Sequence, residues 1–349
     1  MDENIIPHSR PTLGEEEALV AAEVVRSGYI TQAEKVEEFE EELARFAGVK
    51  GAVATNSGTS ALHLGLLAMG IKAGDEVILP SYVCSSPMNA VYLADAEPRL
   101  CDIEPESFNI SIGSIEDNIK ENTKVVIVPH MFGNPADLEK IESLGVPIIE
   151  DCAHSIGAVY GNRKVGSIGR FNILSFYANK VLASGEGGAI LSDDEDILQI
   201  ARDCRDYDEK EDYKLRFNYK MTDLQAAIGL VQLKKLPEML KIRKEIAESY
   251  EKALSGLDIT LPRGEFDHIY YRYVIKIQKD ISEAISRIGE EGVMCERPVF
   301  KPLHRYLELR SGFRNSDEAY ATTLSIPIYP SLSDEEQGRV IEAVKKCSG

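Results

Sequence analysis

The sequence predicts an α/β protein whose sheet is mostly parallel. Short apolar, β-branched segments recur through the first two-thirds of the chain, and helical patterns lie between some of them. The first four of these segments lack apolar–polar alternation, which is typical of strands buried on both faces of a parallel sheet. The segments are EVILP (76–80), KVVIVPH (124–130), VPIIED (146–151), FNILSF (171–176) and GGAILS (187–192), with the helical pattern SALHLGLLAMG at 60–70.

Length and composition indicate an ordinary globular protein. The 349 residues are enough for about two domains with sizeable cores. The formal net charge of -19 argues against a nucleic-acid binder, although a local cluster of Arg and Lys could still receive an anionic ligand. The six cysteines include no C-x-x-C pair, so we expect reduced, mostly buried thiols rather than a disulfide framework or a metal site.

Two features predict a cytoplasmic location. The first residues, MDENIIPHSRP, lack the basic end and apolar core of a signal peptide. Apolar runs also stay well short of the roughly 20 residues that a membrane helix needs, so we expect no membrane partner.

The sequence pattern changes near residue 222. Thr222 and Gln225 form a capping box, in which two side chains satisfy free backbone groups at a helix start. The helical run AAIGLVQLKKL follows, and Pro237 then predicts a kink or a break. We therefore expect a large domain at 1–235 and a smaller C-terminal domain at 236–349.

The smaller domain has its own predicted elements. RYVIKIQ (272–278) is expected to form a strand. The last helix should begin at a second capping box, SDEE (333–336), and continue through GRVIEAVKK.

Asp151 directly follows one of the predicted buried strands, in VPIIEDCAHS. In open α/β sheets the carboxyl ends of the strands face the ligand crevice, so this carboxylate is a candidate site residue. An aspartate that caps a helix would explain the same position equally well.

The segment ATNSGTSALHLG (54–65) places small polar residues just before a helical pattern. Backbone N–H groups at such a helix start are free to bind a phosphate. The spacing matches neither a Walker A motif nor G-x-G-x-x-G, and an ordinary capped helix would fit as well. The residues concerned are Asn56, Ser57, Gly58 and Thr59.

Lys180 lies in SFYANKVLASGEGG (175–188), between an apolar run and a glycine cluster. A lysine can form a Schiff base once its ammonium loses a proton, which burial and neighbouring cations favour. Gly185, Gly187 and Gly188 would let the backbone pass close to a flat ligand. Taken alone, Lys180 would more simply be a surface lysine.

The three candidates together fit one cofactor. Pyridoxal phosphate needs an amine for its aldehyde, a carboxylate for its ring nitrogen and a helix N-terminus for its phosphate. The order of phosphate loop, aspartate and lysine is that of the large domain in pyridoxal phosphate enzymes of the aspartate aminotransferase type.

The sequence resembles the DegT/DnrJ/EryC1/StrS family of sugar aminotransferases over nearly its whole length. The resemblance implies a transferase of fold type I, with a mostly parallel seven-stranded sheet in the large domain and a smaller α+β domain. It is carried by SGYITQAEKVEEFEEELARFAGVK (27–50), NSGTSALHLGLLAMGIKAGDEVILPSY (56–82), EDCAHSIGA (150–158), SFYANKVLASGEGG (175–188), FNYKMTDLQAAIGLVQL (217–233) and RPVFKPLH (297–304).

The resemblance implies a role for each matching position. Lys180 would bind the cofactor covalently, Asp151 would pair with its pyridine nitrogen, and His154 would lie near its ring hydroxyl. Asn218 would reach the phosphate bound by the neighbouring subunit, so the catalytic unit would be a homodimer. The phosphate in the chain's own site would be held by Ser57, Gly58, Thr59 and Ser175.

The resemblance also implies a reaction. L-Glutamate would donate its amino group, and Lys180 would move the proton. RPVFKPLH is similar to a segment of enzymes that aminate C4 of nucleotide-linked 4-keto-6-deoxy sugars (UDP-linked HexNAc or GDP-linked) for polysaccharide or glycan biosynthesis. Candidate substrate contacts are Arg297, Lys301, His304 and Tyr82; the alternative is that the residues of RPVFKPLH only cover the surface of the small domain.

Several alternatives remain open. A C3-keto-sugar or inosose aminotransferase of the same family is the nearest one, and a non-catalytic regulatory protein with this fold is another. Lys180 argues against the sugar dehydratases of the family, which carry histidine at that position. Cys84 stands where many relatives place an aromatic ring that stacks on the cofactor, so the stacking contact stays undecided.

Overall fold

The computed structural model describes residues 5–264 and 266–348. Over these residues the large domain is built on one seven-stranded sheet. Its strands, in spatial order, are β1 (Gly51–Thr55), β9 (Gly188–Ser192), β8 (Phe171–Ser175), β5 (Ile148–Asp151), β4 (Thr123–Pro129), β2 (Glu76–Pro80) and β3 (Glu97–Cys101).

The sheet is mostly parallel, as predicted. The five neighbouring strands from β8 to β3 run parallel, and β9 and β1 then pair antiparallel at the other edge. All five strands expected from the sequence are present. Two edge strands, β1 and β3, were not expected from the sequence.

Alternate residues of one strand enter different hydrophobic cores. In β2, Val77 and Leu79 belong to one core cluster, whereas Ile78 belongs to another on the opposite face of the sheet. All three side chains are fully buried. This explains why the strand segments are continuously apolar.

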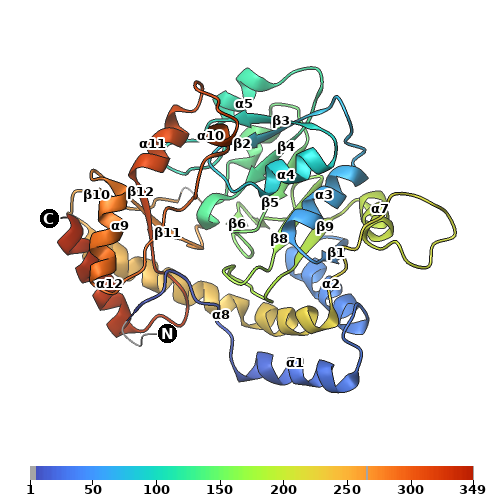
Figure 1. Ribbon diagram of the computed structural model, residues 1–349, viewed down its shortest axis with the longest axis horizontal. Coiled ribbons are helices and arrows are strands. Elements are labelled where there is room, and N and C mark those ends of the chain that lie inside the picture. The colour runs from blue at the N-terminus through green and yellow to red at the C-terminus, as the bar shows by residue number, and fades with distance from the viewer. Residues whose placement is uncertain (1–4, 265, 349) are drawn as a thin grey trace.

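Helices cover both faces of the sheet (Figure 1). Figure 1 also shows the long helix α8 extending beneath the sheet towards the C-terminal elements. The elements of this part are α1 (Glu15–Ser27), α2 (Glu34–Ala47), α3 (Gly58–Ala68), α4 (Ser86–Leu93), α5 (Ile112–Asn118), the 3-10 turn η1 (Met131–Gly133), α6 (Leu138–Glu142), α7 (Glu195–Arg205), α8 (Asp223–Leu254) and the hairpin β6 (Val159–Tyr160) and β7 (Arg163–Lys164).

The C-terminal elements form a smaller α+β unit with its own core (Figure 1). The predicted strand at 272–278 is confirmed as β11, and the capping box at Ser333 and Glu336 begins the last helix as predicted. The elements are the antiparallel strands β10 (Ile259–Thr260), β11 (Tyr273–Ile277) and β12 (Thr323–Ile326), and the helices α9 (Ile281–Glu290), α10 (Leu303–Tyr306), α11 (Arg314–Thr322) and α12 (Asp334–Ser348).

Helix α8 joins the two parts. The capping box of Thr222 and Gln225 forms as predicted, but the helix does not break at Pro237 and continues to Leu254. The domain boundary expected at 235/236 therefore falls inside a continuous helix, and the division of the chain at that point stays a prediction.

Within the described part of the chain, the helices are too short or too polar to span a bilayer.

Candidate active site

The N-terminus of α3 opens onto a cavity at the carboxyl ends of the sheet strands. Ser57 is the N-cap, and its hydroxyl accepts a hydrogen bond from the Ser60 N–H at 3.1 Å. A Cβ atom added at Gly58 would lie 3.0 Å from the Ser175 Cβ, so β8 ends directly beside this helix start. The segment therefore presents backbone N–H groups and hydroxyls to one point, an arrangement suited to an anion.

Lys180 lies in a loop after β8 that is closed by backbone hydrogen bonds. The Phe176 N–H donates to the Gly187 carbonyl at 2.9 Å, and the Ser184 N–H donates to the Phe176 carbonyl at 2.9 Å. The Lys180 N–H donates to the Tyr177 carbonyl at 2.8 Å. Lys180 is thus held in a turn beyond the strand, with its side chain half-buried in the cavity.

Asp151 is the last residue of β5 and is 8% exposed. Its Oδ1 atom accepts a hydrogen bond from the Ala153 N–H at 3.0 Å, and the turn that follows is not a helix, so the capping alternative is not supported. Burial raises the pKa of Asp151, although the Ala153 N–H and Lys180 oppose this. A buried carboxylate of this kind is stabilised by a cationic partner.

These residues line a single cavity of about 260 Å³. The structure thus brings together a lysine, an aspartate and a helix N-terminus that are far apart in the chain. The predicted residues in its wall are Ser57, Gly58, Thr59, Asp151, His154, Ser175 and Lys180.

His154 lies between two aromatic rings. Its ring stacks on Tyr271 with centroids 4.3 Å apart and faces Phe132 at 6.3 Å. Burial, with the neighbouring cations Lys180 and Arg272, holds the pKa of His154 well below the usual range. The imidazole is therefore neutral, and it can donate or accept a hydrogen bond without placing a positive charge near Asp151.

A second cavity of about 760 Å³ adjoins the first and shares Cys84, His154, Tyr177 and Lys180 with it. Arg297 and Lys301 line this second cavity, and their contact with a substrate stays a prediction.

Neither Tyr82 nor His304 is brought into these cavities. Tyr82 is fully buried, and its hydroxyl is 2.7 Å from the Thr323 hydroxyl. His304 is 2% exposed, and its ring nitrogens lie 2.6 Å from the Ser81 hydroxyl and 3.1 Å from Asp317 Oδ1. Both segments turn inward to join the two parts of the chain, so we omit these residues from the proposed substrate contacts.

Cys84 is exposed and lines both cavities, whereas the sequence predicted mostly buried thiols. Desolvation in the pocket raises the pKa of Cys84, which favours the neutral thiol. The other five cysteines are free and at least half-buried, as expected.

Asn218 is exposed and lies outside the cavity walls of its own chain. Its carbonyl accepts a hydrogen bond from the Asn56 side chain at 3.2 Å. The contact expected between Asn218 and a neighbouring subunit stays a prediction.

Sequence reasoning missed several residues of the second cavity, among them Asn179, Tyr271 and Arg272. Asn179 adjoins Lys180 in the chain, and the run YYRY (270–273) places an arginine at the start of a predicted strand. That unusual arginine was the available signal.

His130, Glu150 and Cys152 form a buried group with the composition of a metal site. However, the His130 Nδ1 atom accepts the Ala136 N–H at 3.0 Å, so the ring proton must lie on Nε2, which is 3.0 Å from Glu150 Oε2. His130 is thus a hydrogen-bond donor to Glu150 and not a metal ligand.

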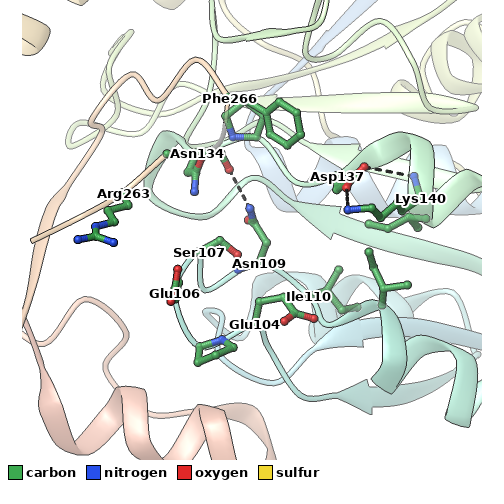
Figure 2. A pocket seen from close by; sticks show the side chains of 15 residues that line it. Glu104, Glu106, Ser107, Asn109, Ile110, Asn134, Asp137, Lys140, Arg263 and Phe266 are labelled. Carbon is green, nitrogen blue, oxygen red and sulfur yellow. Dashed lines mark hydrogen bonds and ion pairs between the residues drawn. The ribbon is translucent and has the colours of Figure 1, made fainter. Parts of the chain in front are cut away.

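A separate cavity of about 650 Å³ lies between the loop after β3, the segment 134–141 and the residues Arg263, Gly264 and Phe266 (Figure 2). Its acidic and basic residues are mixed, and Lys140 pairs with Asp137, the N-cap of its own short helix. Figure 2 shows the Asn109 amide directed at the Asn134 carbonyl, a 3.1 Å hydrogen bond between two loops. We assign no ligand to this cavity.

Comparison with known proteins agrees with this geometry. The model of the DegT/DnrJ/EryC1/StrS aminotransferase family matches residues 11–345. The spore coat polysaccharide biosynthesis protein SpsC of Bacillus subtilis is 35% identical over 376 residues, covering 98% of this chain and 97% of SpsC. A GDP-perosamine synthase of Caulobacter vibrioides is 35% identical over 328 residues, covering 88% of each chain.

Two solved structures have the same fold. The aminotransferase TlmJ from Streptoalloteichus hindustanus superposes with a TM-score of 0.93, at 29% identity and 98% coverage of both chains. Helicobacter pylori PseC, an aminotransferase involved in the biosynthesis of pseudoaminic acid, superposes with a TM-score of 0.93, at 25% identity and 99% coverage of both chains.

Proposed function

The chain belongs to the DegT/DnrJ/EryC1/StrS aminotransferase family, and from that membership we propose that it transfers the amino group of L-glutamate to C4 of a nucleotide-linked 4-keto-6-deoxy sugar. It is a sugar aminotransferase that uses pyridoxal phosphate. The glutamate donor and the identity of the acceptor are the proposed parts.

The observation that carries the proposal is the meeting of Lys180, Asp151 and the α3 N-terminus in one cavity. The set fits pyridoxal phosphate: the half-buried amine suits the aldehyde, and the buried carboxylate suits a protonated ring nitrogen. The close contact between Gly58 and Ser175 makes a cradle that a Cβ atom would narrow. The phosphate would be held by Ser57, Gly58, Thr59 and Ser175.

When bound, the cofactor supplies an electron sink for the carbanion formed at the donor carbon. The chain's own residues then have distinct tasks. In the first half-reaction the Lys180 Nζ atom would take the proton from the α-carbon of glutamate and pass it to the cofactor carbon, and in the second it would move a proton from that carbon to the acceptor carbon. Asp151 would supply a negative charge to the ring nitrogen, and the neutral His154 would lie near the ring hydroxyl.

The acceptor is inferred from the second cavity and from the relatives. Arg297 and Lys301 provide positive charge in the wall of the second cavity, which would suit the diphosphate of a nucleotide sugar. Arg297 is partly engaged, because it donates to the Tyr320 carbonyl and lies over the Tyr320 ring. Similarity to a GDP-perosamine synthase favours C4 amination of a GDP-linked sugar over a C3-keto sugar or an inosose.

We further propose a homodimer with shared active sites. The exposed position of Asn218, beside Asn56 at the start of the phosphate segment, leaves its side chain accessible to a second subunit.

The test combines spectroscopy with acceptor screening. The protein loaded with pyridoxal phosphate should show a visible absorption band that L-glutamate removes with release of 2-oxoglutarate, and a 4-keto-6-deoxy nucleotide sugar should restore the band. Lys180→Ala should abolish both responses, whereas Lys234→Ala on α8 should leave them unchanged. Substantial turnover by Lys180→Ala would sink the catalytic assignment, and restoration by an inosose alone would sink the acceptor assignment.

A further inference from the structure

Tyr271 lies just before β11, and its side chain contacts the loop that carries Lys180. The Nζ atom of Lys180 lies 5.0 Å from the centre of the Tyr271 ring, within the range of a cation–π contact. The Tyr271 hydroxyl donates a hydrogen bond to Asn179 Oδ1 at 3.2 Å. One side chain therefore contacts both the catalytic lysine and the residue before it.

The Tyr271 ring is fixed on its other side. It stacks on His154, with centroids 4.3 Å and planes 20° apart, and the residue is only 5% exposed. The ring is thus held between the histidine and the lysine, and its direction is set by the packing.

The backbone that carries Tyr271 is also braced. The buried Arg243 of α8 donates to the carbonyls of Tyr270 at 3.1 Å, Tyr271 at 3.3 Å and Ile328 at 3.0 Å. On the other side, the Ile269 N–H donates to the Gly133 carbonyl at 2.9 Å. Tyr271 is therefore a rigid support rather than a mobile side chain.

The electrostatic surroundings agree with this position. Burial alone would raise the pKa of Tyr271, but the nearby cations Lys180, Arg272 and Arg243 outweigh it and hold the pKa below the usual value. These cations would stabilise the phenolate form of Tyr271, which agrees with their position around its side chain.

We propose that Tyr271 is a positioning residue that holds the released Lys180 side chain during proton transfer, with its ring facing Nζ and its hydroxyl holding Asn179. The inference rests on the proposed role of Lys180. When Nζ takes the proton from the donor carbon, the C–H bond breaks, an N–H bond forms, and the resulting ammonium lies against the ring face that favours a cation. The same contact keeps Nζ within reach to return a proton to the acceptor carbon.

The test compares three variants of the loaded protein in a single turnover with L-glutamate and with glutamate deuterated at the α-carbon. Tyr271→Leu removes the ring and should slow the loss of the visible band by about 2- to 30-fold while increasing the isotope effect. Tyr271→Phe keeps the ring and should retain most of the rate. Tyr270→Leu is the matched control, because that ring stacks on His268 and not on His154.

A second measurement separates positioning from simple structural support. The rate at which each loaded variant releases pyridoxal phosphate on dilution should stay near that of the wild type. A Tyr271→Leu variant with a wild-type rate and isotope effect would overturn the inference, as would one that only loses the cofactor faster. A wild-type protein whose band does not respond to glutamate would overturn the proposed function and this inference with it.

Discussion

Gly188 lies directly against the backbone of Ser57. A Cβ atom added at Gly188 would lie 2.4 Å from the Ser57 carbonyl carbon and 2.5 Å from the Gly58 nitrogen. The sequence suggested that glycines here would let the backbone approach a flat ligand, whereas Gly188 lets β9 approach the start of α3. The expected phosphate cradle thus depends on a glycine that lines neither cavity.

Gly188→Ala should therefore damage cofactor binding without touching a catalytic group. The new methyl group must displace the first turn of α3, at a cost of about 1–3 kcal/mol for overpacking. We expect affinity for pyridoxal phosphate to fall about tenfold or more, measured by titration of the visible band, with a lower melting temperature.

Gly338→Ala is the control for Gly188→Ala. Gly338 lies inside α12, where an added Cβ atom meets nothing within 4 Å. Alanine there should raise stability by about 0.5–1 kcal/mol and leave cofactor affinity unchanged. Equal behaviour of the two variants would contradict the cradle argument.

Asp151→Asn should separate catalysis from stability. The asparagine can still accept the Ala153 N–H, so the local turn should survive. Loss of the charge opposite the cofactor nitrogen should slow the glutamate half-reaction about 10²-fold or more, measured by stopped-flow absorbance. The control Asp117→Asn, at an exposed carboxylate of α5, should react like the wild type.

The same variant has a stability signature in the protein without cofactor. Burial raises the pKa of Asp151, so its contribution to stability declines as pH rises through that pKa. Asparagine carries no charge, so it avoids the cost of burying a carboxylate. Cofactor-free Asp151→Asn should therefore melt at or above the wild-type temperature at pH 7–8. A markedly lower melting temperature would mean that the carboxylate has a structural partner.

The interior strands of the sheet were predictable from sequence because they are rich in Val, Ile and Leu and are buried on both faces. The two unexpected strands are edge strands with atypical sequences. β1 (GAVAT) is made largely of small residues, and β3 (EPRLC) contains Glu, Pro and Arg. Their strand conformation comes from pairing with β9 and β2, a long-range effect that local propensity does not encode.

The candidate site also contains some residues that the sequence could predict and others that it could not. Asp151, Lys180 and the α3 start could be predicted because each lies at or beyond the carboxyl end of a strand or at a helix start, where local patterns carry the information. Tyr82 and His304 fell within recognisable segments, but their side chains face inward, and a motif does not determine that direction. Tyr271 reaches the site from the segment just before β11, far from Lys180 in the chain, so only tertiary packing could reveal it.

Glu150→Gln should destabilise the protein although Glu150 lies outside the cofactor cavity. Its Oε1 accepts the Ile168 N–H at 2.6 Å and the Gly169 N–H at 3.1 Å, and its Oε2 accepts the Gly166 N–H at 2.9 Å as well as the His130 proton. In glutamine an NH₂ group replaces one of these two oxygens. That group is itself a donor, so it would face N–H groups that need an acceptor.

We expect the free energy of unfolding to fall by about 2–4 kcal/mol in Glu150→Gln, measured by urea denaturation. The exposed Glu238→Gln on α8 should change it by less than about 0.5 kcal/mol. Added zinc should not rescue the Glu150 variant or protect the wild type, because His130 presents a proton to this group. Strong stabilisation of the wild type by zinc would contradict the hydrogen-bond assignment.

Two buried histidines should make the protein less stable in mild acid. Burial, assisted by Arg272, lowers the pKa of His8 to about 3, and burial, assisted by Lys244, lowers that of His268 to about 3. Between these values and the ordinary histidine pKa near 6.5, the unfolded chain binds protons that the folded chain does not, so stability falls as pH falls. From pH 7 to pH 5.5 the two groups should together remove about 2.5 kcal/mol from the free energy of unfolding.

The measurement is urea denaturation at both pH values with saturating pyridoxal phosphate. His268→Asn can still accept the Tyr270 N–H that His268 Nδ1 accepts at 2.9 Å, and it should cancel about half of the loss. An unchanged pH dependence in that variant would show that His268 titrates normally in the folded protein.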